Sequence, residues 1–142
     1  MDLYSKILNI KGQNSKQSIV DAIKETKEKL KGLDYERMCL VYNSYLYETL
    51  LKKHIIVHIV DTKDFNASFE HRFLITYDGK DYYLCDLTYS QFKDREHLKE
   101  LLENGFMKCN DMVLQKYLQI VLKENKNLRI EQVFNSNNSF RR

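Results

Sequence analysis

The spacing of hydrophobic residues divides the chain into segments with a helical or a strand period. Residues 14–31 and 39–53 place apolar side chains about 3.6 residues apart, which is typical of helices with one buried face. Residues 55–60 form a continuous apolar run, as in a strand buried on both faces. The pattern therefore predicts two helices followed by a first strand.

The chain around Asp78-Gly79 predicts a β-hairpin, because this dipeptide suits a type I′ turn and its flanks are rich in β-branched and aromatic residues. With these two residues as the loop, counting outward places His71 opposite Asp86, with Cβ atoms roughly 5 Å apart. A longer loop over residues 78–81 shifts the register by two and is expected to break this pairing. The two-residue loop also pairs Tyr77 with Lys80, Ile75 with Tyr82, and Phe73 with Leu84.

Further elements are predicted after the hairpin. Residues 94–103 read as a helix that Gly105 ends, and residues 110–123 read as a helix with Asn110 as its N-cap. Residues 128–134 are consistent with an edge strand. The apolar stripe of the 110–123 helix is predicted to contain Met112, Val113, Tyr117, Ile120 and Val121.

Helices before and after a small antiparallel sheet define an α+β fold. The chain has 142 residues, of which 43% are hydrophobic, so it is long enough to bury a core. Residues 1–142 are therefore expected to form a single domain.

Composition argues against several classes of function. The net charge of +3 comes without a clear basic face, so nucleic acid is not expected as a partner. No apolar run approaches the roughly 20 residues of a membrane helix, and the N-terminus lacks the apolar core of a signal peptide. Three cysteines without metal or redox spacing suggest a reducing, cytoplasmic compartment. His54 and His58 straddle a helix end and a strand, so neither a metal nor a cofactor is expected.

Cys39 falls at the start of the second predicted helix. Asp34 and Glu36 precede it and suit a helix N-terminus, so Cys39 is expected in or near the first turns. Free N–H groups and the helix dipole stabilise a thiolate at such a position. The alternative is that Cys39 is a small core residue, a common role of free cysteine.

Cys39, His71 and Asp86 together supply a thiol, an imidazole and a carboxylate, the parts of an activated-nucleophile site. In the predicted hairpin, Asp86 accepts a hydrogen bond from His71 and fixes the tautomer of its ring. His71 then maintains the thiolate of Cys39 and protonates the leaving group. Glu70 faces the other side of the hairpin, so it is not assigned the role of the carboxylate.

These residues resemble the papain-like and transglutaminase-like superfamily of thiol enzymes. The resemblance covers residues 32–93 and rests on the helical segment 39–51, on His71 opening one strand and on Asp86 ending the next. It implies N-terminal helices, a helix bearing the nucleophilic cysteine that packs on a small antiparallel sheet, and helices on the C-terminal side.

Two branches of the superfamily are similar in motif. Residues 86–92 are similar to the Asp-x-Thr-x-x-Gln-Phe segment of papain-like bacterial toxin domains that deamidate glutamine on host proteins. This resemblance gives Gln91 a role in stabilising the oxyanion, although Gln91 also fits a plain surface position. It also implies delivery into the cytoplasm of a target cell as one location. The spacing from Cys39 to His71 resembles that of lasso-peptide leader peptidases, which lack the Gln motif.

The expected function is a cysteine-dependent amide hydrolase or acyl-transfer enzyme acting on a protein or peptide substrate. A glutamine deamidase and a peptidase both fit, and transglutaminase activity follows if an amine replaces water. The alternative is a catalytically silent module of the same fold that binds or inhibits a protein partner, because no Gln stands shortly before Cys39.

Overall fold

The computed structural model describes residues 15–33, 39–65, 70–123 and 128–134. Elements labelled α and β are α-helices and strands, and those labelled η are single turns of 3₁₀-helix. Within the described ranges their order is α2 (Ser15–Lys29), α3 (Cys39–Lys52), β1 (Ile56–Asp61), η1 (Thr62–Phe65), β2 (Arg72–Tyr77), β3 (Tyr82–Cys85), η2 (Tyr89–Gln91), η3 (Arg95–Leu98), α4 (Lys99–Asn104), β4 (Phe106–Cys109), α5 (Asp111–Leu122) and α6 (Ile130–Phe134).

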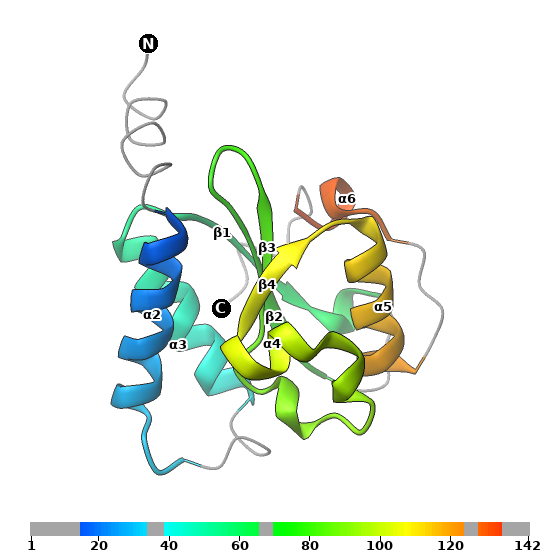
Figure 1. The fold of residues 1–142 in the computed structure, drawn as a ribbon, viewed down its shortest axis with the longest axis horizontal. Helices are drawn as coiled ribbons and strands as arrows, with labels where there is room; N and C mark the ends of the chain where they lie inside the picture. The colour runs from blue at the N-terminus through cyan, green and yellow to red at the C-terminus, as the bar shows by residue number, and fades with distance from the viewer. Residues whose placement is uncertain (1–14, 34–38, 66–69, 124–127, 135–142) are drawn as a thin grey trace.

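A four-stranded antiparallel sheet in the order β1-β2-β3-β4 forms the centre of the fold. Figure 1 shows α2 and α3 on one side of this sheet and α5 and α6 on the other. Successive residues of β2 alternate between the two sides, because side chains alternate along a strand. Leu74 packs with the core under α2 and α3, whereas Phe73 and Ile75 pack with the core under α5. The predicted α+β class is confirmed.

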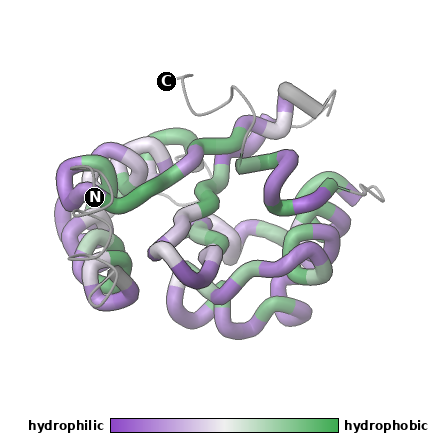
Figure 2. The backbone as a smooth tube through the Cα atoms, turned by 90° about the horizontal axis from the view of Figure 1, so that it is seen from above, coloured by the Kyte–Doolittle hydropathy of each residue, from purple (hydrophilic) through white to green (hydrophobic). Residues whose placement is uncertain are grey.

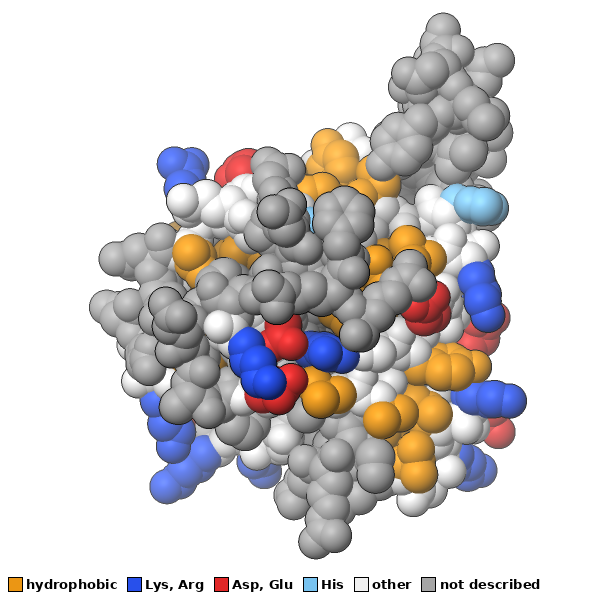
Figure 3. Space-filling model, turned by 180° about the vertical axis from the view of Figure 1, so that it is seen from behind, with side chains coloured by type: hydrophobic (Ala, Val, Ile, Leu, Met, Phe, Trp, Pro, Cys, Tyr) orange, Lys and Arg blue, Asp and Glu red, His pale blue; other side chains and the backbone are white. Residues whose placement is uncertain are grey.

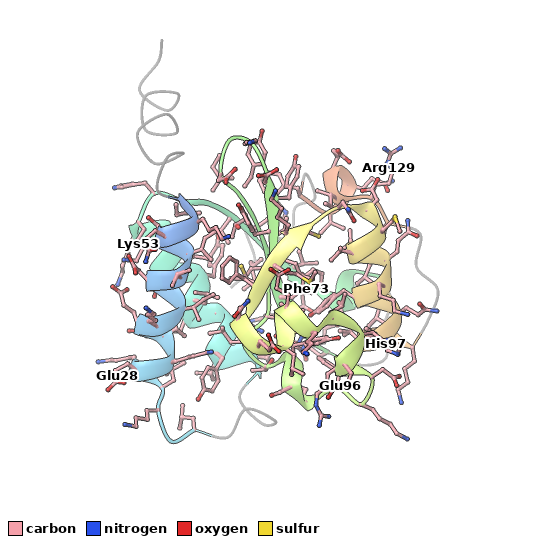
Figure 4. The ribbon with its side chains drawn as sticks, in the orientation of Figure 1. Glu28, Lys53, Phe73, Glu96, His97 and Arg129 are labelled. Atoms are coloured by element: carbon pink, nitrogen blue, oxygen red, sulfur yellow. The ribbon has the colours of Figure 1, made fainter. Side chains whose placement is uncertain are left out.

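One-sided burial explains the helical period of the sequence. In α2, Ile19, Ala22 and Ile23 are buried, whereas the lysines of the helix are exposed. The colouring of Figure 2 accordingly changes between hydrophobic and hydrophilic along the helices. In Figure 4, Lys53 lies at the periphery, whereas Phe73 lies at the centre.

The predicted ends of several helices are confirmed. Helix α3 begins at Cys39, and α5 begins after Asn110, whose side chain accepts a hydrogen bond of 2.9 Å from the backbone N–H of Val113. Gly105 ends α4 in the left-handed conformation with φ of 82°, a conformation that costs glycine little.

Three predictions in the C-terminal half were wrong, and one strand was missed. The segment 94–103 is broken into η3 and α4, and the strand β4 that follows was not predicted. Residues 130–134 form a helix instead of an edge strand, because β1 and β4 occupy the two edges of the sheet. Met112 is 80% exposed, because the buried stripe of α5 runs through other positions such as Leu114 and Leu118. Residues 135–142 lie outside the described part of the chain.

The predicted hairpin exists, but its predicted register was wrong. The last pair before the turn is Tyr77 with Tyr82, so the loop spans residues 78–81 and Ile75 pairs with Leu84. The carboxylate of Asp78 explains this choice. Its Oδ1 accepts hydrogen bonds from the backbone N–H groups of Lys80 (2.8 Å) and Asp81 (2.7 Å), which closes a longer turn than the type I′ dipeptide.

The surface of the described residues is mixed in charge. On the face seen in Figure 3, Lys and Arg side chains are spread over separate places, several of them beside Asp or Glu. Pairs such as Lys63 and Glu70 (3.1 Å) lie at the surface, where solvent screens them, and contribute little to stability. Within the described ranges, no helix combines the length and the apolarity needed to cross a membrane.

Candidate active site

His71 and Asp86 flank the open end of the hairpin, one residue before β2 and one residue after β3. The backbone holds both residues in place. The N–H of His71 donates to Thr62 Oγ1 (2.8 Å), and the N–H of Thr62 donates to the carbonyl of His71 (2.9 Å). The N–H of Asp86 donates to the carbonyl of Gly105 (3.0 Å), just before β4.

The side chains of His71 and Asp86 meet, with 2.8 Å between Nε2 and Oδ2. The predicted contact is therefore present, although the predicted pairing is not. The observed register, continued outward, sets Asp86 opposite Phe73 and places His71 two residues further along the same face. Such diagonal neighbours have Cα atoms about 7–8 Å apart, a gap that an imidazole spans. The longer loop consequently did not separate the pair.

The carboxylate of Asp86 accepts five hydrogen bonds, and its side chain has no exposed surface. Oδ1 accepts from Asn43 Nδ2 (2.9 Å) and from both N–H and Oγ1 of Thr88 (3.0 Å each). Oδ2 accepts from His71 Nε2 (2.8 Å) and from the hydroxyl of Tyr117 (2.7 Å). Burial by itself raises the pKa of Asp86, but the charge of His71 and the hydrogen bonds outweigh it, so the pKa lies below its ordinary value. Asp86 is an ionised carboxylate at neutral pH.

The ionised carboxylate determines the tautomer of His71. A carboxylate only accepts hydrogen bonds, so Nε2 of His71 carries the hydrogen that lies between them. When the ring is neutral, Nδ1 is consequently its basic nitrogen. The hydroxyl of Tyr117 lies 3.0 Å from the same Nε2 and closes a triangle with Asp86.

Aromatic rings surround the imidazole. Phe92 contacts the ring of His71 edge-on, with centroids 4.9 Å apart and planes at 87°. The ring of Tyr117 packs against Phe73 at 4.7 Å, which holds its hydroxyl toward Asp86. The side chains of His71 and Tyr117 have no exposed surface. A low-dielectric shell of this kind strengthens every charge interaction inside it.

Helix α3 reaches this network through Asn43. Its Nδ2 donates to the carbonyl of Arg72 (2.8 Å) and to Asp86, and its Oδ1 accepts from the N–H of Leu87 (3.0 Å). Cys39 is the first residue of α3 and precedes Asn43 by one turn, so both positions belong to the same helical face. The side chain of Cys39 lies outside the described part of the structure.

Gln91 lies on η2, and its side chain is half-buried. Its Nε2 donates to Thr88 Oγ1 (3.2 Å), and Thr88 in turn donates to Asp86. Gln91 thus joins the network through Thr88. It also lines, with Phe92 and Lys93, an open groove of about 440 Å³ beside the end of α5.

The two remaining cysteines are buried in the apolar cores as free thiols. Burial raises the pKa of Cys85, and it raises the pKa of Cys109 to about 12. Cys85 packs on the side of the sheet that α2 and α3 cover, opposite to His71, as expected of a packing residue. Searched over the described residues, groups of three or more metal-binding side chains are absent.

Sequence reasoning missed Asn43 and Tyr117 as members of the site. The sequence pattern predicts Tyr117 only as part of the apolar stripe of α5, and it gives Asn43 no role. One signal for Asn43 was available. It is a polar residue one turn after Cys39, on a face that otherwise carries residues such as Leu46 and Leu50.

The chain matches no protein-family model, no curated protein and no solved structure in three comparisons with known proteins. Its function is consequently argued from the geometry of this site.

Proposed function

We infer that this chain is a thiol amide hydrolase or acyltransferase of the papain-like and transglutaminase-like kind, with Cys39 as nucleophile, His71 as base and acid, and Asp86 as the residue that orients His71. The observation that carries this proposal is the buried His71–Asp86 pair of 2.8 Å. This pair leaves Nδ1 as the basic nitrogen of His71. The hydrogen bonds of Asn43 connect α3 to the same end of the sheet. Cys39 begins that helix, where a thiolate is stabilised.

Buried polar networks cost stability unless every member is satisfied, so their presence calls for an explanation. Asn43, His71, Thr88 and Tyr117 have no exposed surface and converge on one carboxylate. Replacing such a network by apolar residues is often neutral or stabilising. The presence of this network at the end of a sheet supports a chemical role.

The chemistry follows from these positions. The thiol of Cys39 gives its proton to Nδ1 of His71, and the thiolate attacks the carbonyl carbon of an amide. The C–N bond breaks, and His71 gives its proton to the departing nitrogen, which leaves as ammonia or an amine. Water, deprotonated by His71, then cleaves the thioester and returns the thiolate. The net change is amide plus water to carboxylic acid plus amine, and an amine in place of water gives transamidation.

The substrate class is a protein or peptide. The open groove next to Gln91 and Phe92 offers an extended chain a place to lie, and Phe92, which lines it, also contacts the ring of His71. Deamidation, peptide hydrolysis and transamidation share the acyl-enzyme, so the same residues serve each of them. The oxyanion forms beside the backbone N–H of Cys39, and Gln91 is the side chain proposed to assist it.

The complete burial of His71 and Asp86 also favours a second candidate. A catalytically silent module of this fold uses the network only to hold its shape, and it binds a protein partner through its surface. The two candidates differ in one property, the reactivity of Cys39.

The test is the alkylation rate of each cysteine by iodoacetamide against pH, resolved by mass spectrometry. Cys85 and Cys109 are slow internal controls, because burial raises the pKa of each thiol. We expect Cys39 to react at pH 6 on the order of a hundredfold faster than an ordinary thiol with a pKa of about 8.5.

Two variants complete this test. His71→Gln keeps a donor for Asp86 but cannot accept a proton, so it should slow Cys39 strongly. His58→Gln, at another buried histidine of the sheet, should leave the rate unchanged. A slow Cys39 in the folded wild-type protein would exclude the enzyme and favour the silent module. A fast Cys39 justifies trapping the acyl-enzyme with hydroxylamine on glutamine-containing peptides.

A further inference from the structure

Asn43, on α3, forms hydrogen bonds with both arms of the hairpin at its open end. Its amide uses both hydrogens of Nδ2, one on the carbonyl of Arg72 and one on Asp86, and its Oδ1 accepts from the N–H of Leu87. The three distances are 2.8, 2.9 and 3.0 Å, and the side chain is fully buried. One residue thus connects the helix, the start of β2 and the turn after β3.

Most other contacts of α3 with the sheet differ in kind. One further hydrogen bond, from Arg72 Nη1 to Ser44 Oγ, is long at 3.4 Å and reaches β2 alone. Tyr42, Leu46 and Leu50 pack in the apolar core, and apolar contacts have little directional preference. A helix held by such contacts alone tolerates small shifts along its axis. The hydrogen bonds of Asn43 have preferred lengths and angles, so they define where the first turn of α3 lies against the hairpin.

We propose that Asn43 is a positioning residue that sets the distance between Cys39 and His71, a role that rests on the function proposed above. Positions 39 and 43 are neighbours on one helical face, with Cβ atoms about 5–6 Å apart. A shift of the helix at position 43 therefore moves position 39 by nearly the same amount. Proton transfer between a thiol and an imidazole is sensitive to displacements of about 1 Å.

Thr88 provides a matched control. Its hydroxyl donates to the same Oδ1 of Asp86 at 3.0 Å, and its side chain is also fully buried. The same Oγ1 also accepts a hydrogen bond of 3.2 Å from Gln91 Nε2. Asp86, Thr88 and Gln91 all lie within residues 86–91, however, so neither hydrogen bond reaches α3. Removing the hydroxyl weakens the carboxylate network without releasing α3.

The experiment compares Asn43→Ala with Thr88→Val in the full chain. The readouts are the alkylation rate of Cys39 from about pH 5 to pH 9 and the ¹⁵N chemical shifts of His71, which report its tautomer. We expect Asn43→Ala to slow Cys39 at pH 6 by roughly ten- to hundredfold and to move the pH midpoint toward that of a free thiol. His71 should keep its proton on Nε2 in this variant. Thr88→Val should slow Cys39 clearly less than Asn43→Ala does, because it weakens the network around Asp86 but leaves the hydrogen bonds of α3 in place.

Several results would overturn the proposal. One is a folded Asn43→Ala protein with wild-type alkylation, and another is an equal loss in Thr88→Val. A third is loss of the Nε2–H tautomer in Asn43→Ala, because Asn43 would then act on the His71–Asp86 pair instead of the helix. A slow Cys39 in the wild-type protein is a different outcome, which removes the proposed function itself.

Asn43→Asp is the second variant if alanine prevents folding. It keeps the volume and the contact with Leu87, and it replaces both Nδ2 hydrogen bonds with contacts between oxygens. The same slowing of Cys39 is expected. If neither variant folds, Asn43 is required for folding only, and this result also overturns the positioning role.

Discussion

Replacement of Asp86 by Asn tests the centre of the proposed site, because it removes the charge and keeps the shape. The amide oxygen can take the place of Oδ1 and keep the hydrogen bonds from Asn43 and Thr88. The amide NH₂ then takes the place of Oδ2, where it meets the two donors His71 Nε2 and Tyr117 OH. Nε2 of His71 must then accept a hydrogen bond from the NH₂, so the ring hydrogen moves from Nε2 to Nδ1.

The magnitude follows from these two hydrogen bonds. A hydrogen bond to a buried charge contributes about 1.5–3 kcal/mol, and loss of the charge also removes its desolvation cost. We expect Asp86→Asn to lower the free energy of unfolding by about 2–4 kcal/mol. For a chain of this size that is a decrease in Tm of roughly 6–16 °C. The wrong tautomer should lower any amidase activity by on the order of 10³–10⁴-fold, as in serine triads.

The assay combines urea unfolding at pH 7, ¹⁵N shifts of His71 and alkylation of Cys39. Asp61→Asn is the matched control, because Asp61 is also buried and pairs with Arg72 at 3.2 Å. The control should lose stability without a change in the tautomer of His71. The reasoning is refuted if Asp86→Asn leaves both the Nε2–H tautomer and the reactivity of Cys39 as in wild type.

Three further predictions concern stability. The folded pKa of Asp86 lies below its ordinary value of 3.8, so its stabilisation is complete above that value and is lost as pH falls through the folded pKa. Urea unfolding should show this acid loss below about pH 4 in wild type and not in Asp86→Asn. Gly105→Ala should cost about 1–3 kcal/mol in urea unfolding, because φ is 82° and a Cβ would lie 2.8 Å from Leu87 Cδ2. An unchanged urea midpoint would contradict this. Lys123→Gly should raise the free energy of unfolding by about 0.5–1 kcal/mol, because Lys123 ends α5 in a strained left-handed conformation with φ of 55°. A lower Tm in this variant would contradict the strain.

The meeting of His71 and Asp86 shows how a wrong register can still place two residues correctly. The real loop is two residues longer than the predicted one, and side chains repeat every two residues along a strand. Both residues therefore stay on the same face, and the imidazole spans the diagonal. A shift by one residue would have put them on opposite faces and removed the contact.

The contacts that Asn43 and Tyr117 make with Asp86 could not be predicted from the sequence pattern. Asn43 and Asp86 are 43 positions apart, and Tyr117 and Asp86 are 31 apart. Their hydrogen bonds depend on how α3 and α5 pack on the two faces of the sheet. An amphipathic pattern predicts that a helix buries one face, but it does not predict which polar residue on that face meets which partner.

The sequence by itself determined the local features: the period of each helix, the cap at Asn110, the stop at Gly105 and the presence of a hairpin around Asp78. These depend on interactions between residues close in the chain, whose energies are set by residue type and spacing. The tertiary structure alone decided the position of β4 and the hydrogen bonds that Asn43 and Tyr117 donate to Asp86. Those features connect distant segments, and their geometry exists only once both faces of the sheet are covered.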